Sequence, residues 1–360
     1  MGFIDDTLRR LDDSLGEAIL DPSRWGAALD HVSALVDGDG VMLLRSHNRT
    51  PGIPCTASVA ELVDDYFRHG WHVNDLRTRA VPRVMRGEVV TDHGILTAEE
   101  MARAPFYNDL LLRHGYHWFA VAGFHAGSEH WAVSVQRKAR RGPFEAVQPL
   151  AGLAQRLGRA ATLSEALGRA ALDGHLRGLE QVGEAALALD GAGRVVGANA
   201  RADALFDAAF RVVDGTVRIA DTRAREALAG VVGALPHRSP PPAGPILVPR
   251  GDRRPLILRV LPVIEAARSP FLGAQMLLTV TDLAAEQRPD PAVLAQVFGL
   301  TAAEARLAAI LAGGASLDEA AGTLGIAVGT VRSQIKAVFA KTGTGRQGAL
   351  VALLGAAGLR

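Results

Sequence analysis

The side chains with the clearest potential for chemistry are two pairs of histidines at helical spacing. His69 and His72 lie three residues apart, as do His114 and His117. Four imidazoles would suit zinc or haem, but no acidic or cysteine ligand accompanies them at a defined spacing. Packed or solvated histidines are therefore the better interpretation. The sequence predicts neither a metal site nor a bound cofactor.

Other motifs of enzymatic chemistry are also missing from the sequence. Gly191, Gly193 and Gly197 have the wrong spacing for a dinucleotide fingerprint, and a strand-like run follows them instead of a helix. There is no glycine-rich phosphate loop, nucleophile elbow or paired-carboxylate signature. The single cysteine, Cys55, excludes an internal disulfide, fits a reducing compartment and is best interpreted as a small buried hydrophobe. We expect a protein that is not an enzyme.

Most of the large amphipathic aromatic rings gather in the first third of the chain. All three tyrosines and all four tryptophans precede residue 132. Rings of this kind either fill the core of a domain or line a concave site. They are Trp25, Tyr66, Trp71, Tyr107, Tyr116, Trp118 and Trp131. A ligand pocket is therefore expected in this part of the chain.

The formal net charge of +1 hides an uneven distribution of basic residues. Residues 320–360 contain five basic residues and no acidic one. In the helix expected over 327–341, Val331 and Ile335 share one face, whereas Arg332 and Lys336 share the opposite face. By itself, such a face is more often solvated than bound to a nucleic acid.

The elements expected around this helix favour the interpretation that its basic face binds a nucleic acid. Thr301 and Glu304 have the spacing of a capping box, and so do Ser316 and Glu319. Gly325 stands where a tight turn would join two short helices. This is the spacing of a helix-turn-helix motif, so we interpret the basic face as a DNA-binding surface.

Length and composition indicate several folded domains. A chain of 360 residues predicts two or three domains, and 48% hydrophobic with 21% charged residues excludes a wholly disordered chain. A long helix is expected over 149–182; its apolar stripe either packs on its own domain or forms a dimer seam, which we favour. Prolines predict a surface loop over 236–245 and a linker over 284–291. No signal peptide or run of about 18 apolar residues appears, so we expect a cytoplasmic protein without a membrane anchor.

The last part of the chain resembles the DNA-binding domain of LuxR-type transcription regulators. The resemblance covers about 294–355 and rests on Leu300-Thr301-x-x-Glu304, the Ala321-x-x-Leu324-Gly325-Ile326 turn and the run from Thr330 to Lys336. It implies that the helix enters the major groove, with Thr330, Arg332, Ser333 and Lys336 facing bases or phosphates, and that Lys341 and Arg346 face the backbone. Two departures stand out. Many members carry Ser at the position of Ala327 and Lys at the position of Gly329. Without that Ser and Lys, this chain lacks a helix N-cap and a phosphate contact.

The middle of the chain resembles a PAS domain over about 180–284. The resemblance rests on Asp190-x-x-Gly193, Asn199, the closing Thr281-Asp282-Leu283 and the order of hairpin, short helices and three strands. The segment has no cysteine, and His237 adjoins the proline loop, so neither haem nor a flavin adduct is expected. Two interpretations of this domain are equally favoured. Either it contains a pocket for a small ligand, or its core is closed and it serves only to relay a signal or to dimerise.

The first part of the chain resembles the GAF-like ligand-binding domain of the same regulators, particularly of the acyl-homoserine-lactone receptors. In those receptors a Tyr and an Asp nine residues later bind the ligand, a spacing that Tyr66 and Asp75 share. Leu62 and Leu76 depart from the receptors' Trp and Pro, which puts a homoserine lactone in doubt. Alternatively, Asp75 caps a helix or is a buried carboxylate whose hydrogen bonds are all made within the protein. The expected ligand-binding residues are Tyr66, Trp71, Asp75, Tyr107 and Trp118.

These observations predict a multidomain α+β protein: a GAF-like α/β sensor over 1–160, a connecting helix over 149–182, a PAS-like α+β domain over 180–284 and an all-α, four-helix LuxR-type helix-turn-helix domain over 292–360. We expect a homodimeric transcription regulator that binds double-stranded DNA under the control of a small molecule or a protein. RNA polymerase is a further candidate partner. A ligand-free relay with DNA-binding output, and an enzyme with a regulatory helix-turn-helix domain, are the alternatives.

Overall fold

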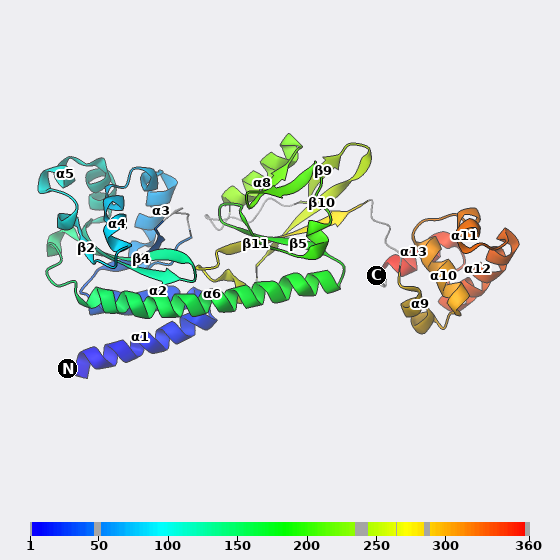
Figure 1. Ribbon diagram of the computed structural model, residues 1–360, viewed down its shortest axis with the longest axis horizontal. Coiled ribbons are helices and arrows are strands. Elements are labelled where there is room, and N and C mark those ends of the chain that lie inside the picture. The colour runs from blue at the N-terminus through cyan, green and yellow to red at the C-terminus, as the bar shows by residue number, and fades with distance from the viewer. Residues whose placement is uncertain (1, 47–51, 235–243, 264, 284–288, 357–360) are drawn as a thin grey trace. The chain divides into compact units, whose positions relative to one another are not determined.

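The computed structural model describes all residues except 1, 47–51, 235–243, 264, 284–288 and 357–360. The chain packs as two compact units, the first formed by Met1–Pro249 with Leu256–Thr281 and the second by Arg250–Pro255 with Asp282–Arg360. Both are shown in Figure 1. Most of the predicted proline loop and linker, together with His237, lie outside the described residues. The chain is a mixed α+β protein, as the sequence predicts.

The first unit contains a four-stranded sheet, a five-stranded sheet and a separate two-stranded sheet. We call the parts of the chain around the two larger sheets the first and second lobes. The sheet of the first lobe has the strand order β1-β4-β3-β2. Its strands are β1 (Gly40–Arg45), β2 (Val90–Thr91), β3 (Tyr116–Ala126) and β4 (Glu129–Lys138). Strands β3 and β4 form a long antiparallel hairpin, and Gly127, with a φ of 56°, allows its tight turn.

Each face of this sheet packs against a different set of helices. Val41 and Leu43 of β1 face a core shared with α1 (Gly2–Leu20), α2 (Trp25–Leu35) and α6 (Pro149–Gln181), whereas Met42 and Leu44 face the opposite side. The elements that cover that side are α3 (Ala60–Arg68), α4 (Val81–Val84), α5 (Ala98–Arg103) and the single-turn π-helix η6 (Phe106–Leu111). Alternation along β1 thus separates a closed core from the side that holds a cavity.

Short 3-10 helices join these elements. They are η1 (Pro22–Arg24), η2 (Ala57–Val59), η3 (Trp71–Val73), η4 (Leu76–Ala80), η5 (Asp92–Gly94), η7 (Leu112–His114) and η8 (Ala139–Arg141). Asp21 caps η1 just before Pro22, because its carboxylate accepts the backbone N–H of Ser23. Gly70, with a φ of 71°, ends α3 and turns the chain into η3.

Helix α6 runs without a break for 33 residues through both lobes. Much of its apolar stripe packs inside the first unit: Leu150, Leu153 and Leu157 belong to the core of the first lobe, and Leu172 and Leu176 to that of the second. For these residues the favoured dimer seam is wrong and the intrachain alternative holds. Leu167 and Val182 of the predicted stripe are exposed. Gly158 allows the close approach to β3, because a Cβ there would lie 3.1 Å from the carbonyl oxygen of His125.

The second lobe is built on a five-stranded sheet in the order β6-β5-β11-β10-β9. Its elements are β5 (Ala185–Asp190), β6 (Val195–Ala198), α7 (Ala200–Asp203), β7 (Phe210–Val213), β8 (Thr216–Ile219), α8 (Thr222–Ala234), β9 (Ile246–Arg250), β10 (Arg253–Pro262), η10 (Glu265–Arg268) and β11 (Ala274–Asp282). The predicted hairpin of β5 and β6 is confirmed: Asp190 Oδ1 accepts from the backbone N–H groups of Ala192 and Arg194 in its turn. The separate β7–β8 hairpin was not predicted.

The described helices of the second unit are α9 (Pro291–Phe298), α10 (Ala302–Ala312), α11 (Leu317–Leu324), α12 (Val328–Thr342) and α13 (Gln347–Ala356). Both predicted capping boxes are confirmed, at Thr301–Glu304 and Ser316–Glu319. Gly325 ends α11 with a φ of 65°. Val331, Ile335 and Val338 of α12 are buried in the core.

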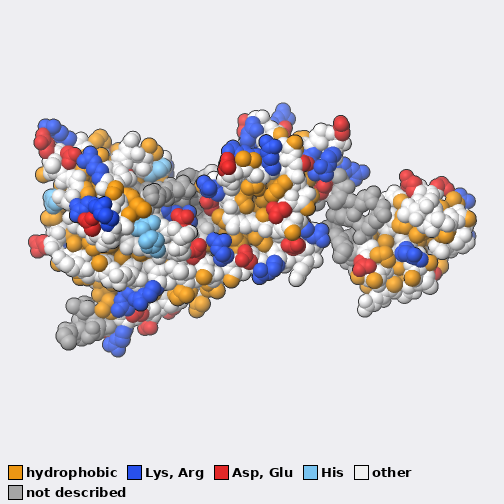
Figure 2. Space-filling view, in the orientation of Figure 1, with side chains coloured by type: hydrophobic (Ala, Val, Ile, Leu, Met, Phe, Trp, Pro, Cys, Tyr) orange, Lys and Arg blue, Asp and Glu red, His pale blue; other side chains and the backbone are white. Residues whose placement is uncertain are grey.

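No single helix within the described ranges is long and apolar enough to cross a membrane, although the bent pair α9 and α10, which meet at 115°, would pass together by length and composition. On the visible face of the first unit, basic and acidic side chains are interspersed (Figure 2).

Candidate functional site

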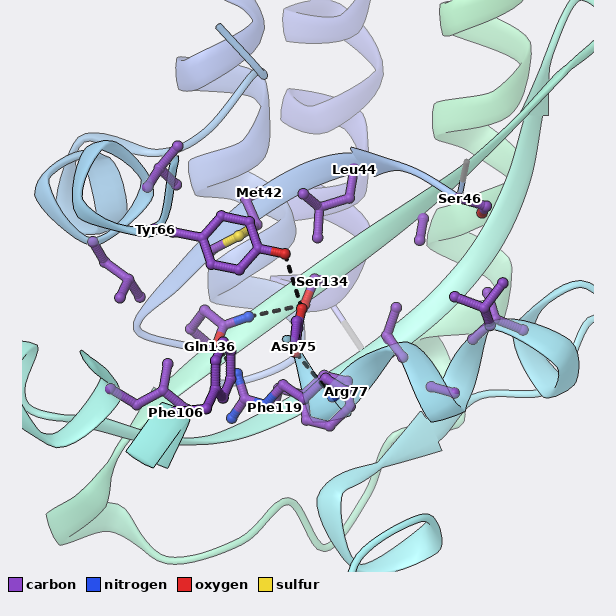
Figure 3. A pocket seen from close by; sticks show the side chains of 18 of the residues that line it. Met42, Leu44, Ser46, Tyr66, Asp75, Arg77, Phe106, Phe119, Ser134 and Gln136 are labelled. Atoms are coloured by element: carbon purple, nitrogen blue, oxygen red, sulfur yellow. Dashed lines mark hydrogen bonds between the residues drawn. The ribbon is translucent and has the colours of Figure 1, made fainter. Parts of the chain in front are cut away.

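A cavity lies in the first lobe, on the side of the sheet that faces α3, α4 and η6. Apolar side chains make most of its wall (Figure 3). The polar side chains among them are Arg45, Ser46, Tyr66, Asp75, Arg77, Ser134 and Gln136. The apolar lining includes Met42, Leu44, Leu62, Val63, Val81, Val84, Phe106, Leu110, Leu111, Phe119 and Val121. An apolar cavity with a few polar groups is the usual form of a small-molecule site.

Tyr66 and Asp75 meet in the wall of this cavity. The Tyr66 hydroxyl donates to Asp75 Oδ2 at 2.9 Å, and both residues are buried. Asp75 Oδ1 also accepts the backbone N–H of Arg77 at 2.9 Å, so Asp75 caps η4. The structural role that the sequence left open for Asp75 is therefore present, and the same carboxylate lines the cavity.

Arg77 holds the polar end of the cavity together, a role that was not predicted. Its Nη1 donates to Gln136 Oε1 at 2.8 Å, and its Nη2 to Asp92 Oδ1 at 3.2 Å and to the His117 carbonyl at 2.7 Å. Its Nε reaches the Tyr107 hydroxyl at 3.3 Å. With 7% exposure, Arg77 is a buried cation whose donors point into the protein wall.

The charges of this network support one another. Burial alone lowers the pKa of Arg77, but the Asp92 carboxylate and Tyr107 hold it above its ordinary value. Burial raises the pKa of Tyr107, whose hydroxyl donates to Asp92. Asp92 also accepts the backbone N–H of Phe119 at 2.6 Å. At neutral pH the raised pKa values of Arg77 and Tyr107 thus keep a guanidinium cation and a neutral phenol in the cluster.

Three of the predicted ligand residues do not line the cavity. Tyr107 lies behind Arg77, and Trp71 packs edge-on against Phe106 at 6.4 Å between ring centroids. Trp118 is half-buried against His117, with its indole N–H directed to the Ala139 carbonyl at 3.4 Å. The predicted residues that line the cavity are Tyr66 and Asp75.

Of the four candidate histidines, two bind Asp65, whereas His72 and His117 pack against aromatic rings. Asp65 accepts from His69 Nδ1 at 2.6 Å and contacts His114 Nε2 at 2.8 Å, and the His114 hydrogen bond holds the pKa of Asp65 below its usual range. Burial raises the pKa of the Cys55 thiol to about 11, so it is a poor nucleophile at neutral pH. No group of three side chains suited to a metal ion occurs among the residues that the structure describes.

A second candidate site is the outer face of α12. Thr330, Arg332, Ser333 and Lys336 are exposed, opposite the buried Val331, Ile335 and Val338. Arg346, just before α13, is exposed as well. As the sequence predicts, Ala327 provides no side-chain cap to α12.

Lys341 differs from the other predicted DNA-contacting residues. Its Nζ lies 2.6 Å from Glu304 Oε2, which also accepts the backbone N–H of Thr301 at 2.7 Å. The lysine therefore binds the glutamate of the α10 capping box and links that helix to the end of α12. This internal role was not predicted.

Comparisons with known proteins find distant structural likenesses only. No family model matches the sequence, and no curated protein matches it. The ligand-binding domain of VqsR from Pseudomonas aeruginosa aligns with 17% identity and a TM-score of 0.33, covering 45% of this chain and 95% of that one. The phage VqmA–DPO complex aligns with 20% identity and a TM-score of 0.21, over 53% and 91%. The E. coli DhaR(N)–DhaL complex aligns with 13% identity and a TM-score of 0.22, over 79% and 90%. At such scores these likenesses carry no argument about function.

Proposed function

We propose that the protein is a sequence-specific DNA-binding transcription regulator whose activity is controlled by a small molecule bound in the first-lobe cavity. The observation that carries the DNA-binding part is the outer face of α12. Its exposed polar and basic row lies opposite a buried apolar row, and α12 follows a short helix that ends in a glycine turn. The regulator acts as a homodimer on two half-sites, with RNA polymerase as a further partner.

The DNA-binding proposal is tested by substituting Lys336 with alanine. DNA selected by the full-length protein from a random pool serves as the probe, and affinity is measured across a salt series. Losing one phosphate contact weakens binding and lowers the slope of log affinity against log salt by about 1. Arg306→Ala is the matched control, because Arg306 is exposed on α10 and donates to the Ala302 carbonyl of its own helix. Equal affinities and slopes for both variants and the wild type would show that α12 is not the DNA-contacting helix.

The ligand part of the proposal rests on the cavity. Asp75 and Tyr66 offer hydrogen-bonding groups in an apolar wall, whereas the Arg77 guanidinium is bound by Asp92, Gln136, Tyr107 and the His117 carbonyl. Arg45, the other arginine of the wall, donates to the Phe271 carbonyl. With both cations engaged by protein groups, a mainly apolar ligand that carries a hydrogen-bond donor fits better than an anion.

Native mass spectrometry of protein purified from its own source tests this part. A retained small molecule supports the sensor, its absence favours the ligand-free relay, and a turnover product favours an enzyme. The neutral apolar fluorophore N-phenyl-1-naphthylamine provides a second test. It should bind the wild type and the control Ala166→Leu, on the exposed side of α6, but not Ala132→Leu, which fills the cavity wall. Equal binding by Ala132→Leu would place the fluorophore elsewhere.

A further inference from the structure

One side chain of the second lobe is buried in the core of the first. Phe271, between η10 and β11, is 2% exposed and belongs to the hydrophobic cluster between the first-lobe sheet and helices α1, α2 and α6. Every other buried member of that cluster lies between Leu11 and Ala161. The Phe271 ring lies edge-on to Trp25 at 4.7 Å and to Trp131 at 5.0 Å between centroids.

The residues beside Phe271 reinforce this contact. Ser269, 1% exposed, shares a hydrogen bond of 3.0 Å with Ser164 of α6. Gly273 adopts a φ of 78°, and a Cβ there would lie 2.9 Å from Arg45 Nη2. The loop 269–273 therefore contacts the first lobe and α6 through three of its residues, Ser269, Phe271 and Gly273.

Arg45 lies between this loop and the ligand cavity. It ends β1, lines the cavity and also lines a second, smaller pocket at the junction of the two lobes. Its Nη2 donates to the Phe271 carbonyl at 3.4 Å, and its Cζ lies 5.2 Å from the centre of the Trp131 ring. A displacement of Arg45 by an occupant of the cavity would thus act directly on the backbone that leads into β11.

We infer that Phe271 and Arg45 couple the two lobes, so that a change in the wall of the ligand cavity reaches β11. The mechanical coupling rests on these contacts alone. Its use as a signal path rests on the proposed function, because it needs a ligand in the cavity.

Hydrogen exchange of the full-length protein tests the coupling through a pair of matched phenylalanines. Phe271→Ala should speed exchange about tenfold or more in β4 and α2, in a lobe to which Phe271 does not belong by sequence. Phe210→Ala is the control: Phe210 is 0% exposed, but its contacts lie in the core of the second lobe. It should speed exchange in the second lobe only. Phe271→Leu, which keeps most of the apolar volume, replaces the alanine variant if that variant does not fold. If Phe271 and Phe210 variants both leave β4 and α2 unchanged, the coupling does not exist.

A matched pair of arginines tests the place of Arg45. Arg45→Met should speed exchange over 269–280, whereas Arg137→Met should not. Arg137 lies in the same sheet and also packs on a ring, but its partners are Asp37, Pro143 and Phe144 of the first lobe. Unchanged exchange over 269–280 in Arg45→Met would remove Arg45 from the path.

The fluorophore N-phenyl-1-naphthylamine separates failure of this inference from failure of the proposed function. Bound in the cavity of the wild type, it should alter exchange over 269–280, and this change should disappear in Arg45→Met. Binding without any change over 269–280 contradicts the signal path but leaves the cavity as a ligand site. If the fluorophore does not bind, the ligand proposal loses support, while the phenylalanine pair still decides the coupling.

Discussion

At the scale of single residues, Arg77 is the side chain on which the cavity depends most. It joins Asp92, Gln136, Tyr107 and the His117 carbonyl, which come from four separate segments of the first lobe. No local spacing in the sequence connects these positions, so this network could not be predicted from periodicity. Tyr66 and Asp75, by contrast, were predicted from the resemblance to the ligand-binding domain of LuxR-type regulators, in which a Tyr and an Asp have the same nine-residue spacing.

Arg77→Met should lower the free energy of unfolding by about 3–5 kcal/mol, because it leaves the Asp92 carboxylate buried without its cation. Arg77→Lys should not restore the loss, since an ammonium group cannot reach four partners in a plane. Urea unfolding of the full-length protein measures both. Arg79→Met is the control, because Arg79 pairs with Glu100 at the surface and such pairs contribute about 0–1 kcal/mol. Equal effects at Arg77 and Arg79 would show that the network adds no stability.

The pair of Glu304 and Lys341 predicts a dependence on pH. The hydrogen bond from Lys341, followed by that from the Thr301 backbone, holds the pKa of Glu304 below 4.5. A lowered pKa means that the stabilisation is complete above pH 4.5 and is lost as the pH falls through the pKa of the folded state. NMR titration of the glutamates should therefore show the pKa of Glu304 rising toward 4.5 in Lys341→Met. The pKa of Glu319, whose capping box contains no lysine, should not move.

At the scale of elements, local sequence signals identified those helices and strands whose ends carry their own chemistry. The capping boxes of α10 and α11 and the Asp190 turn of the β5–β6 hairpin are of this kind. The β7–β8 hairpin had such a signal that was not used: Asp214 and Gly215 both have positive φ values, 50° and 70°, as a type I′ turn needs. The partner of the α6 stripe could not be predicted, because an apolar stripe does not reveal which surface covers it.

Helix α12 lacks a side-chain N-cap. Substituting alanine for each of two glycines near its start should change stability in opposite directions. Gly329 lies in the first turn, where an added Cβ meets nothing within 4 Å. Gly329→Ala should therefore stabilise the second unit by up to ~1 kcal/mol. Gly325 has a φ of 65°, so Gly325→Ala should destabilise it by about 1–2 kcal/mol. Chemical denaturation followed by helical circular dichroism measures both. Stabilisation by both substitutions would contradict the left-handed turn between α11 and α12.

At the scale of the whole molecule, three predicted domains correspond to two compact units in the structure. The difference arises at α6 and Phe271, because a helix and a core residue shared by two sheets make their separation costly. Sequence patterns indicate where a domain begins and ends, but they do not show which side chains cross from one domain into the core of another.

Calorimetry of the full-length protein should therefore show two unfolding transitions, with the two lobes of the first unit unfolding together. Arg77→Met should lower the midpoint of the larger transition only, because Arg77 lies in the first unit. Gly329→Ala should raise the midpoint of the smaller one only. A third transition in the wild type would mean that the lobes unfold independently despite the burial of Phe271. A shift of both midpoints by either substitution would instead mean that the two units unfold cooperatively as one.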